Sequence, residues 1–249
     1  MPKQSLSLAD KILIICREIF PNETGYYFEA GANDGISYSN TLKLNTELGW
    51  TGMLVEPSPT AFKQLKVNRN SDICVNFALV GDSTQKIVLG TFGSGSLLSS
   101  SHPILKYNDV ARLKHRIPGM ARLRKVLKMR PSVIEISVPA KAISVLIDEY
   151  DVKKIHVMTL DVEGTEEEVL QGLSDLCLPD IVIVETREFN LAAITEILLS
   201  KGYLLVLDLT PAKSSKFKGA QVDDHRDLLW VHLSRVDLVP KLICVTESF

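Results

Sequence analysis

Short apolar runs alternate with amphipathic stretches along most of the chain. The apolar runs are hydrophobic almost throughout, which is typical of parallel strands covered on both faces. Repeated strand–helix units of this kind predict a doubly wound α/β sheet with right-handed crossovers. The predicted strands are residues 26–31, 51–56, 73–81, 154–164, 180–186, 203–209 and 227–233, and the predicted helices are 39–48, 58–69, 142–150, 165–173 and 191–202.

Helix-start signals support this division. Ser7 is followed three residues later by Asp10, and Thr165 by Glu168, which is the spacing of a capping box. Ser58 stands directly before a proline, the arrangement of a cap followed by a proline at the first helical position. The pair at Ser7 predicts an additional helix near the N-terminus.

Length and composition indicate one domain. The chain has 249 residues, of which 45% are apolar and 23% charged, enough to fill a sizeable core. The net charge of −2 argues against a nucleic-acid footprint over the whole protein, so we expect no nucleic-acid partner. The predicted organisation is a single domain over residues 1–249, with an N-terminal helical segment at 1–24 and a basic insertion or lid at 93–131.

The insertion is strongly basic. Between positions 106 and 130, nine lysines and arginines face a single acid, Asp109. Residues 118–131 carry apolar positions at helical spacing with basic residues around them. Three interpretations stay open: a lid that recruits a phosphorylated or lipid-linked substrate, a helix on a membrane surface, or an amphipathic helix packed on the edge of the domain.

The four cysteines are isolated from one another, at Cys16, Cys74, Cys177 and Cys244. Without a C-x-x-C pair or a histidine at ligand spacing, they are predicted to be buried free thiols in a reducing compartment, and no metal site is expected. The N-terminus shows no export signal, and no apolar run has the length of a transmembrane helix. We therefore expect a soluble, cytoplasmic protein.

A glycine turn follows the strand predicted at 26–31. Gly31 and Gly35 allow a tight turn and a close approach by a ligand, at the edge of the sheet where α/β proteins bind ligands. The spacing is G-x-x-x-G, so the dinucleotide fingerprint G-x-G-x-x-G is absent. The turn therefore predicts a nucleotide-like ligand without a pyrophosphate on a helix N-terminus.

Acids end the next two predicted strands. Glu56 lies 21 residues beyond Gly35, where a carboxylate can accept hydrogen bonds from both hydroxyls of a ribose. Asp82 follows the strand predicted at 73–81, and it either meets the exocyclic amine of an adenine or is a simple turn residue.

Candidate catalytic groups lie farther along the chain. Asp161 and Glu163 end the strand predicted at 154–164, and alternation along that strand predicts that both point to one face. Such a pair can polarise a hydroxyl, act as a general base or hold a metal ion. Glu185 ends the following strand and either contacts substrate or pairs with Arg187. His102, in a serine-rich stretch, is either a base or an ordinary loop residue.

Four blocks in this order resemble the FkbM family of S-adenosylmethionine-dependent methyltransferases. They read FEAGANDG, GMLVEPSPTAFKQLKVNR, FALVGD and LDVEGTEEEVLQGL, and the resemblance covers residues 26–92 and 133–186. It implies the Rossmann-like class I methyltransferase fold, with a mostly parallel seven-stranded sheet, helices on both faces and an antiparallel last strand at 227–233.

The resemblance also implies a cofactor and its contacts. The cofactor would be S-adenosyl-L-methionine, with its ribose on Glu56 and its adenine near Asp82. The methionine part would be wrapped by the turn, and the cofactor-binding set is Glu29, Gly31, Ala32, Asn33, Asp34, Gly35, Glu56, Pro57, Ser58 and Asp82.

Members of the family are expected to methylate hydroxyl oxygens, mostly on sugars, glycolipids or macrolides. The partner implied here is a sugar or glycoconjugate, and Asp161 is the first choice for the base, with Glu163 second. Two alternatives remain. A nicotinamide-dependent dehydrogenase is disfavoured by the missing fingerprint, and a non-catalytic cofactor-binding protein of the same fold is disfavoured by the retained acids.

Overall fold

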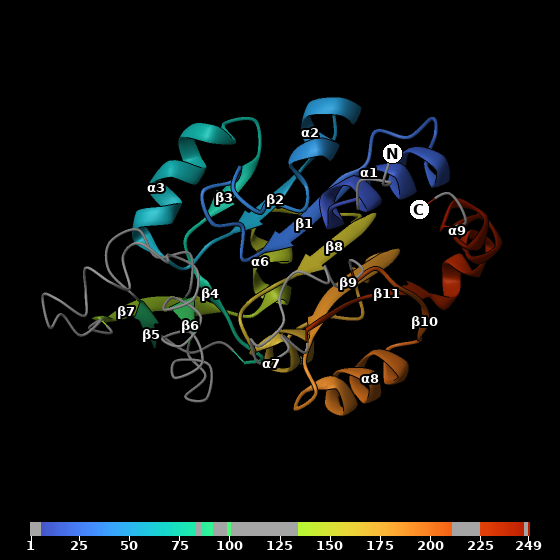
Figure 1. Cartoon of the computed structure of the whole chain (residues 1–249). Coiled ribbons are helices and arrows are strands. Elements are labelled where there is room, and N and C mark those ends of the chain that lie inside the picture. The colour runs from blue at the N-terminus through green and yellow to red at the C-terminus, as the bar shows by residue number, and fades with distance from the viewer. Residues whose placement is uncertain (1–5, 83–85, 92–98, 101–133, 211–224, 247–248) are drawn as a thin grey trace, which may run out of the picture.

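The computed structural model describes residues 6–82, 86–91, 99–100, 134–210, 225–246 and 249. A seven-stranded sheet in the order β10-β11-β9-β8-β1-β2-β3 forms its centre (Figure 1). The strands are β1 (Tyr26–Ala30), β2 (Thr51–Val55), β3 (Ile73–Val75), β8 (Val157–Leu160), β9 (Ile181–Thr186), β10 (Tyr203–Asp208) and β11 (Arg226–His232). β11 runs antiparallel to the other six strands of this sheet, which are parallel to one another. This topology confirms the predicted fold class.

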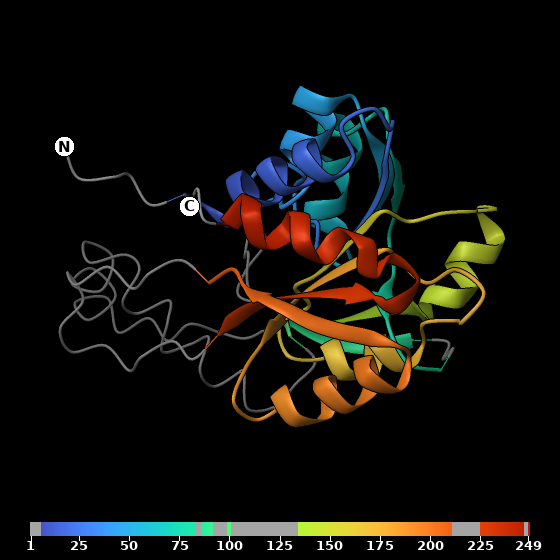
Figure 2. The same cartoon turned by 90° about the vertical axis from the view of Figure 1, so that its right-hand side faces the viewer.

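Helices cover both faces of the sheet. One face carries α1 (Leu8–Ile19), α2 (Leu42–Leu48), α3 (Pro59–Asn68) and α9 (Val239–Thr246), which follows a short 3₁₀ segment, Leu233–Leu238. The other face carries α6 (Ile143–Glu149), α7 (Glu166–Gln171) and α8 (Leu191–Ser200). Figure 2 shows α1 and α9, from opposite ends of the chain, lying side by side over the sheet.

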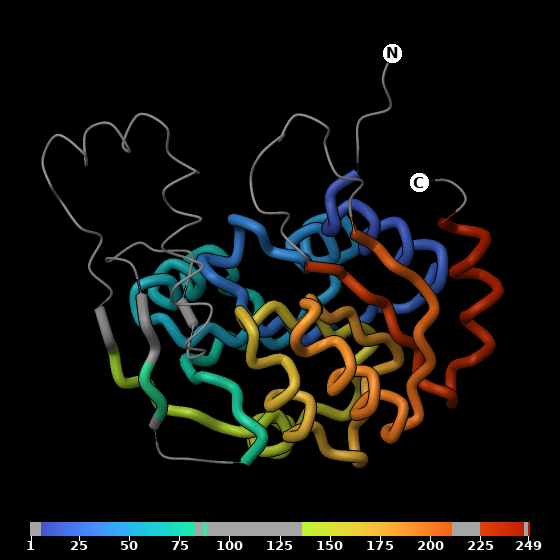
Figure 3. Tube along the Cα trace, turned by 60° about the horizontal axis from the view of Figure 1, so that its bottom comes forward, coloured from blue at the N-terminus to red at the C-terminus, as the bar shows by residue number. Residues whose placement is uncertain are grey.

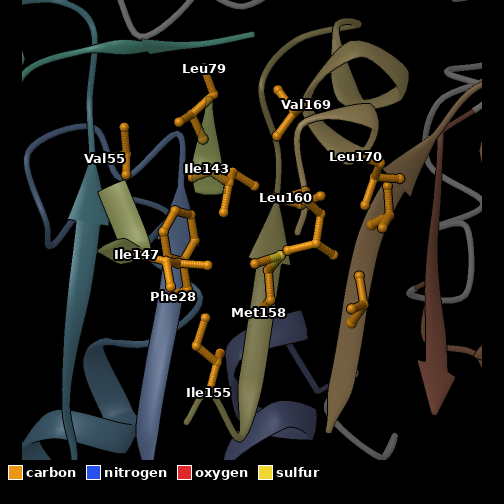
Figure 4. Packing of buried hydrophobic residues seen from close by; sticks show 14 of the residues in the cluster. Phe28, Val55, Leu79, Ile143, Ile147, Ile155, Met158, Leu160, Val169 and Leu170 are labelled. Carbon is orange, nitrogen blue, oxygen red and sulfur yellow. The ribbon is translucent and has the colours of Figure 1, made fainter. Parts of the chain in front are cut away.

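The strands are apolar throughout because alternate residues enter different cores. In β1, Tyr27 packs under α1 and α2, whereas Phe28 packs under α6. Figure 4 shows Phe28 and Met158 from the sheet beneath Ile143 and Ile147 of α6. Burial of this apolar surface on both faces is the main source of stability in such a fold.

A second, four-stranded sheet lies beside the main one, and Figure 1 labels its strands. The Cα trace in Figure 3 shows its green segments at one edge of the molecule. Its order is β4-β7-β5-β6, and its strands are β4 (Ala78–Leu79), β5 (Lys86–Thr91), β6 (Ser99–Ser100) and β7 (Ile134–Lys141). The single strand predicted at 73–81 is therefore wrong. The Asn76 side chain donates to the main-chain carbonyls of Glu56 and Pro57, and the chain beyond it leaves β2 and pairs with β7 instead.

Several local predictions can be compared with this structure. The capping box at Ser7 and the cap at Ser58 are confirmed, whereas the Thr165 side chain makes no capping hydrogen bond, so the box predicted there is wrong. All four cysteines are free, but Cys244 is exposed and Cys74 only partly buried, so the prediction of buried thiols holds for Cys16 and Cys177 alone. Apart from β6, the basic insertion lies outside the described residues, and the domain limits stay a prediction. Within the described ranges, no helix has the length and apolar character needed to cross a bilayer.

Candidate active site

The loop after β1 turns sharply and closely approaches the end of β8. Gly31, Asn33 and Gly35 all have positive φ angles, of 83°, 49° and 78°. A Cβ atom built on Gly31 would lie 1.9 Å from the backbone oxygen of Asp161. Only glycine fits there, so the turn that the sequence assigned to a ligand also fixes the position of Asp161.

Two carboxylates hold this loop in shape. Asp34 accepts from the backbone amides of Ile36 (2.9 Å) and Ser37 (2.6 Å). The buried Glu29 accepts from the amide of Asn40 at 2.7 Å and from the hydroxyls of Ser39 and Thr41. Burial raises the pKa of Glu29, against these hydrogen bonds. Both side chains therefore organise the loop, and a direct contact with a cofactor stays a prediction for each.

Arg69, at the end of α3, stabilises the loop from behind. Its side chain is fully buried, with 1% exposed. Its guanidinium donates to the Gly35 carbonyl (3.1 Å), Ser39 Oγ (3.2 Å), Thr41 Oγ1 (3.2 Å), Tyr27 OH (2.7 Å) and Asp72 Oδ2 (2.9 Å). The sequence did not indicate this role, because an arginine in the last turn of a helix is normally exposed to solvent and interacts with the helix dipole.

Glu56 joins the end of β2 to the glycine turn, and its contact with a ribose stays a prediction. One carboxylate oxygen accepts from the amide of Asn33 at 2.8 Å, and the other from the amide of Ser58 at 2.7 Å. Each oxygen keeps a lone pair for a further donor such as a ribose hydroxyl. Burial raises the pKa of Glu56 to about 7, against the two amide hydrogen bonds.

This raised pKa predicts a pH-dependent cofactor affinity. Ribose hydroxyls that donate to Glu56 favour its charged form, which predominates above pH 7 in the free protein. Binding below pH 7 must therefore release a proton, and the Kd for S-adenosylmethionine is expected to rise about tenfold per pH unit at most as the pH falls from 7 to 6. Calorimetric titration across this range measures the change.

The control is Glu56→Gln, which cannot titrate at this position. Any pH dependence that it retains belongs to the cofactor or to other groups, so the difference between the two profiles reports Glu56. Parallel profiles for the wild type and Glu56→Gln would contradict a ribose contact.

The remaining predicted cofactor residues have different surroundings. Ala32 is buried and donates to the Val55 carbonyl at 3.1 Å. Asp82 lies in an exposed turn after β4, and no hydrogen bond among the described residues joins it to Glu56 or to the glycine turn. Its predicted contact with adenine therefore stays a prediction.

The chain leaves β8 before Asp161, which corrects the predicted alternation. The strand ends at Leu160, and Glu163 has a φ of 59°, so residues 161–164 form a turn rather than extended backbone. Asp161 hydrogen-bonds the carboxyl of Glu185, whereas Glu163 forms an ion pair with Arg187 at 3.3 Å. The two acids thus have separate partners instead of acting as one same-facing pair.

Arg187 also contacts Glu185, at 2.8 Å. Of the two alternatives left open for Glu185, the structure shows the ion pair with Arg187, whereas a contact with substrate stays a prediction. Burial, followed by the nearby Glu185 carboxyl, raises the pKa of Asp161 well above its usual range. Asp161, next to the end of β9, therefore holds its proton more tightly than an exposed aspartic acid.

Glu166 shapes the turn between Asp161 and α7. It is buried and accepts from the amides of Val162 (3.1 Å) and Gly164 (3.0 Å) and from the Asn190 side chain (3.0 Å). Burial raises its pKa to about 7. From the sequence, Glu166 is a glutamate in the first turn of a helix. Its favourable interaction with the helix dipole is a sufficient explanation for that position, so no further role was predicted.

A further buried acid, Asp227, was missed by the sequence analysis. It lies opposite Glu185 in the β9–β11 ladder, and burial raises its pKa to about 6. Its position at the start of a predicted strand gave no signal of proximity to Glu185. His102 lies outside the described residues, and among those described no three His, Cys, Asp or Glu side chains are arranged to hold a metal ion.

The sheet order, with a single antiparallel strand, defines a class I S-adenosylmethionine-dependent methyltransferase fold. The family model for the methyltransferase FkbM domain matches residues 29–205, so the chain belongs to that family. The protein is accordingly an S-adenosylmethionine-dependent methyltransferase. This membership leaves the dehydrogenase alternative without support.

Solved structures that align with the chain are distant. Precorrin-6y C5,15-methyltransferase from Geobacter metallireducens GS-15 is 10% identical over 93% of this chain and 91% of that chain, with a TM-score of 0.42. The METTL16 methyltransferase domain is 10% identical over 90% and 66%, with a TM-score of 0.46. The N-terminal domain of human METTL16, in complex with SAH, is 11% identical over 93% and 74%, with a TM-score of 0.43. No curated protein matches the chain.

Proposed function

We propose that this methyltransferase transfers a methyl group to a hydroxyl oxygen, and that this hydroxyl belongs to a sugar of a glycan or glycoconjugate. The observation that carries the proposal is the contact between the glycine turn and Asp161. It holds an acid of raised pKa directly beside the loop assigned to the methyl donor.

The donor half fits the residues present. The turn at 31–35 provides a cradle without a Cβ at its closest approach, and Glu56 keeps free lone pairs for hydroxyl donors. When bound, S-adenosylmethionine supplies a methyl group on a sulfonium. The chain's own residues would hold the donor in line with the acceptor and exclude water from it.

The acceptor half is rich in carboxyl groups, which supports a polyol. Four acids lie where β8 and β9 end and β11 begins, namely Asp161, Glu163, Glu185 and Asp227. Arg187 lies among them. Carboxylates accept hydrogen bonds from sugar hydroxyls but repel phosphate. The phosphate of a phosphorylated or lipid-linked acceptor would therefore bind away from this edge. The basic stretch at 106–130 has the positive charge that such a phosphate requires.

Proton removal is the chemistry that the protein must add. A sugar hydroxyl is poorly acidic, so a positioned acceptor for its proton accelerates the transfer by about 10²–10⁴-fold. Asp161 is the group assigned to receive that proton, whereas Glu163 has the more structural role of pairing with Arg187.

The experiment has two stages. Thermal unfolding is first measured with S-adenosylmethionine, S-adenosylhomocysteine and NAD, and stabilisation by the first two alone is expected. The protein is then incubated with S-adenosylmethionine and a panel of defined glycosides and lipid-linked sugars, and methylated products are detected by mass. Donor binding with methylation of amines but of no glycoside would overturn the hydroxyl assignment. Donor binding without any transfer would favour the non-catalytic alternative.

A further inference from the structure

Three neighbouring strands place acids in one row at the carboxyl edge of the sheet. Asp161 follows β8, Glu185 lies in β9, and Asp227 lies opposite Glu185 in β11. Leu160 and Val184 are register partners, so Asp161, just beyond the end of β8, and Glu185, in β9, each directly follow one of them. The row is a consequence of sheet register, which brings together residues that are 66 positions apart at its ends.

Asp161 and Glu185 can hydrogen-bond only if they share a proton. The side chains are in hydrogen-bond contact, and both are carboxyl groups. Oδ1 of Asp161 is buried, and no N–H or O–H donor of the described residues reaches it. Two carboxylates without a proton would repel each other across this contact, so the stable state holds one proton between them.

Arg187 distinguishes the two partners. Its guanidinium contacts Glu185 at 2.8 Å and Glu163 at 3.3 Å, and it is largely buried. It therefore supplies Glu185 with a counter-charge at hydrogen-bond distance. The shared proton therefore belongs mainly to Asp161, which agrees with the direction of its pKa.

We infer that Asp161 and Glu185 act as one proton-sharing pair in which Glu185, held by Arg187, is the final proton acceptor. This inference rests on the proposed function. Asp161 is then the residue that contacts the acceptor hydroxyl, and Arg187 is a positioning residue that acts through Glu185.

The transfer balances without any added reactant. The acceptor oxygen gains the methyl group and loses its proton, and the electron pair of the broken S–C bond stays on sulfur. The acceptor proton bonds to the oxygen of Asp161 that faces the hydroxyl, while the proton already shared moves to Glu185. Loss of that proton to water after product release restores the starting state.

The charged groups around the pair set its response to pH. Glu163 and Glu166, from the turn before α7 and from α7 itself, both raise the proton affinity of Asp161. On the other side, Asp227 lies next to Glu185, and its own charge is influenced by Lys11 of α1, by Asp208 of β10 and by His225. A test by pH alone would mix these groups, so it needs substitutions within the pair.

The first test requires no acceptor. Protein labelled with ¹³C at the Asp and Glu carboxyl carbons, and saturated with S-adenosylhomocysteine, is titrated by NMR, with Asp161→Asn identifying the Asp161 signal. We expect Asp161 to remain protonated well above its usual range, and to titrate at a lower pH in Glu185→Gln, where the neighbouring carboxyl group is gone. An Asp161 that titrates like an exposed aspartate in the wild type would overturn the inference.

The second test uses a glycoside that the wild type methylates. At saturating donor and acceptor, Glu185→Gln is expected to slow a single turnover about 10²-fold, because the final proton acceptor is lost. Glu163→Gln is the matched comparison, since Glu163 shares Arg187 and acts on Asp161 through its charge, and it should slow the step only severalfold. Glu196→Gln, exposed on α8, controls for the change of charge.

Equal losses in Glu185→Gln and Glu163→Gln would overturn the inference, since a general effect of charge at Arg187 would then explain both. If the wild type binds S-adenosylmethionine but methylates no glycoside, the proposed function fails. The NMR titration then still decides whether the pair shares a proton.

Discussion

Asp161→Asn is expected to lower the rate of methyl transfer about 10²–10⁴-fold, the range supplied by a positioned general base. The amide retains the shape of the carboxyl and can donate to Glu185, but it cannot take a proton from a hydroxyl. Affinity for S-adenosylmethionine is expected to stay within about threefold, because the glycine turn contacts the backbone of Asp161 rather than its carboxyl.

The measurement compares single-turnover rates with donor affinity in the same variant. Asp175→Asn is the matched control, because this aspartate is 82% exposed and its ion pair with Lys201, at 3.3 Å, lies at the surface. It should leave both quantities unchanged. Full turnover in Asp161→Asn would remove Asp161 from the reaction, whereas equal losses of turnover and donor affinity would indicate a defect in the turn.

The residues proposed to hold the donor lie together because their placement follows from rules of regular structure. Parallel strands place their carboxyl ends at one edge, so Gly31 and Glu56, 25 positions apart, were assigned to the same ligand. The structure joins them through the amide of Asn33, which donates to Glu56. What the sequence could not supply was the second constraint on Gly31, its contact with Asp161, because that depends on how closely β1 and β8 end.

The acceptor half was predicted less well because alternation applies only within a strand. The run that ends at Asp161 and Glu163 looks extended, yet the strand stops at Leu160. Glu166 then binds the amides of Val162 and Gly164, which fixes a turn in place of extended chain. The partner of Asp161 is consequently Glu185, from another strand, and no local pattern indicates such a pair.

The second sheet escaped prediction for a similar reason. An apolar run from 73 to 81 gives no sign of the break at Asn76, whose side chain binds two carbonyls of the neighbouring segment. Long-range pairing with β7, some sixty residues later, then determines the path of β4. Contacts of this range are set by the whole fold and override local preference.

Arg69→Met is expected to lower the free energy of unfolding by about 3–5 kcal/mol, the cost of leaving buried charges without their partner. Methionine fills a similar volume, so the loss would come mainly from Asp72 and from the loop groups that the guanidinium binds. For a domain of this size, the melting temperature is expected to fall by roughly 6–20 °C. Thermal and urea unfolding, with circular dichroism as the signal, measure the change.

Arg17→Met makes the same substitution in an exposed ion pair. Arg17 and Glu47 are 3.0 Å apart, and their side chains are 49% and 42% exposed, so solvent screening should limit the loss to about 1 kcal/mol or less. Arg69→Lys should fall between the two, because it keeps the charge but not the planar fork that reaches Tyr27, Gly35 and Asp72 together. If Arg69→Met were no more destabilising than Arg17→Met, the loop would be held by Glu29 and Asp34 alone. The affinity of Arg69→Met for S-adenosylmethionine would then also be unchanged. An anchoring role for Arg69 requires instead that stability and this affinity fall together in the variant.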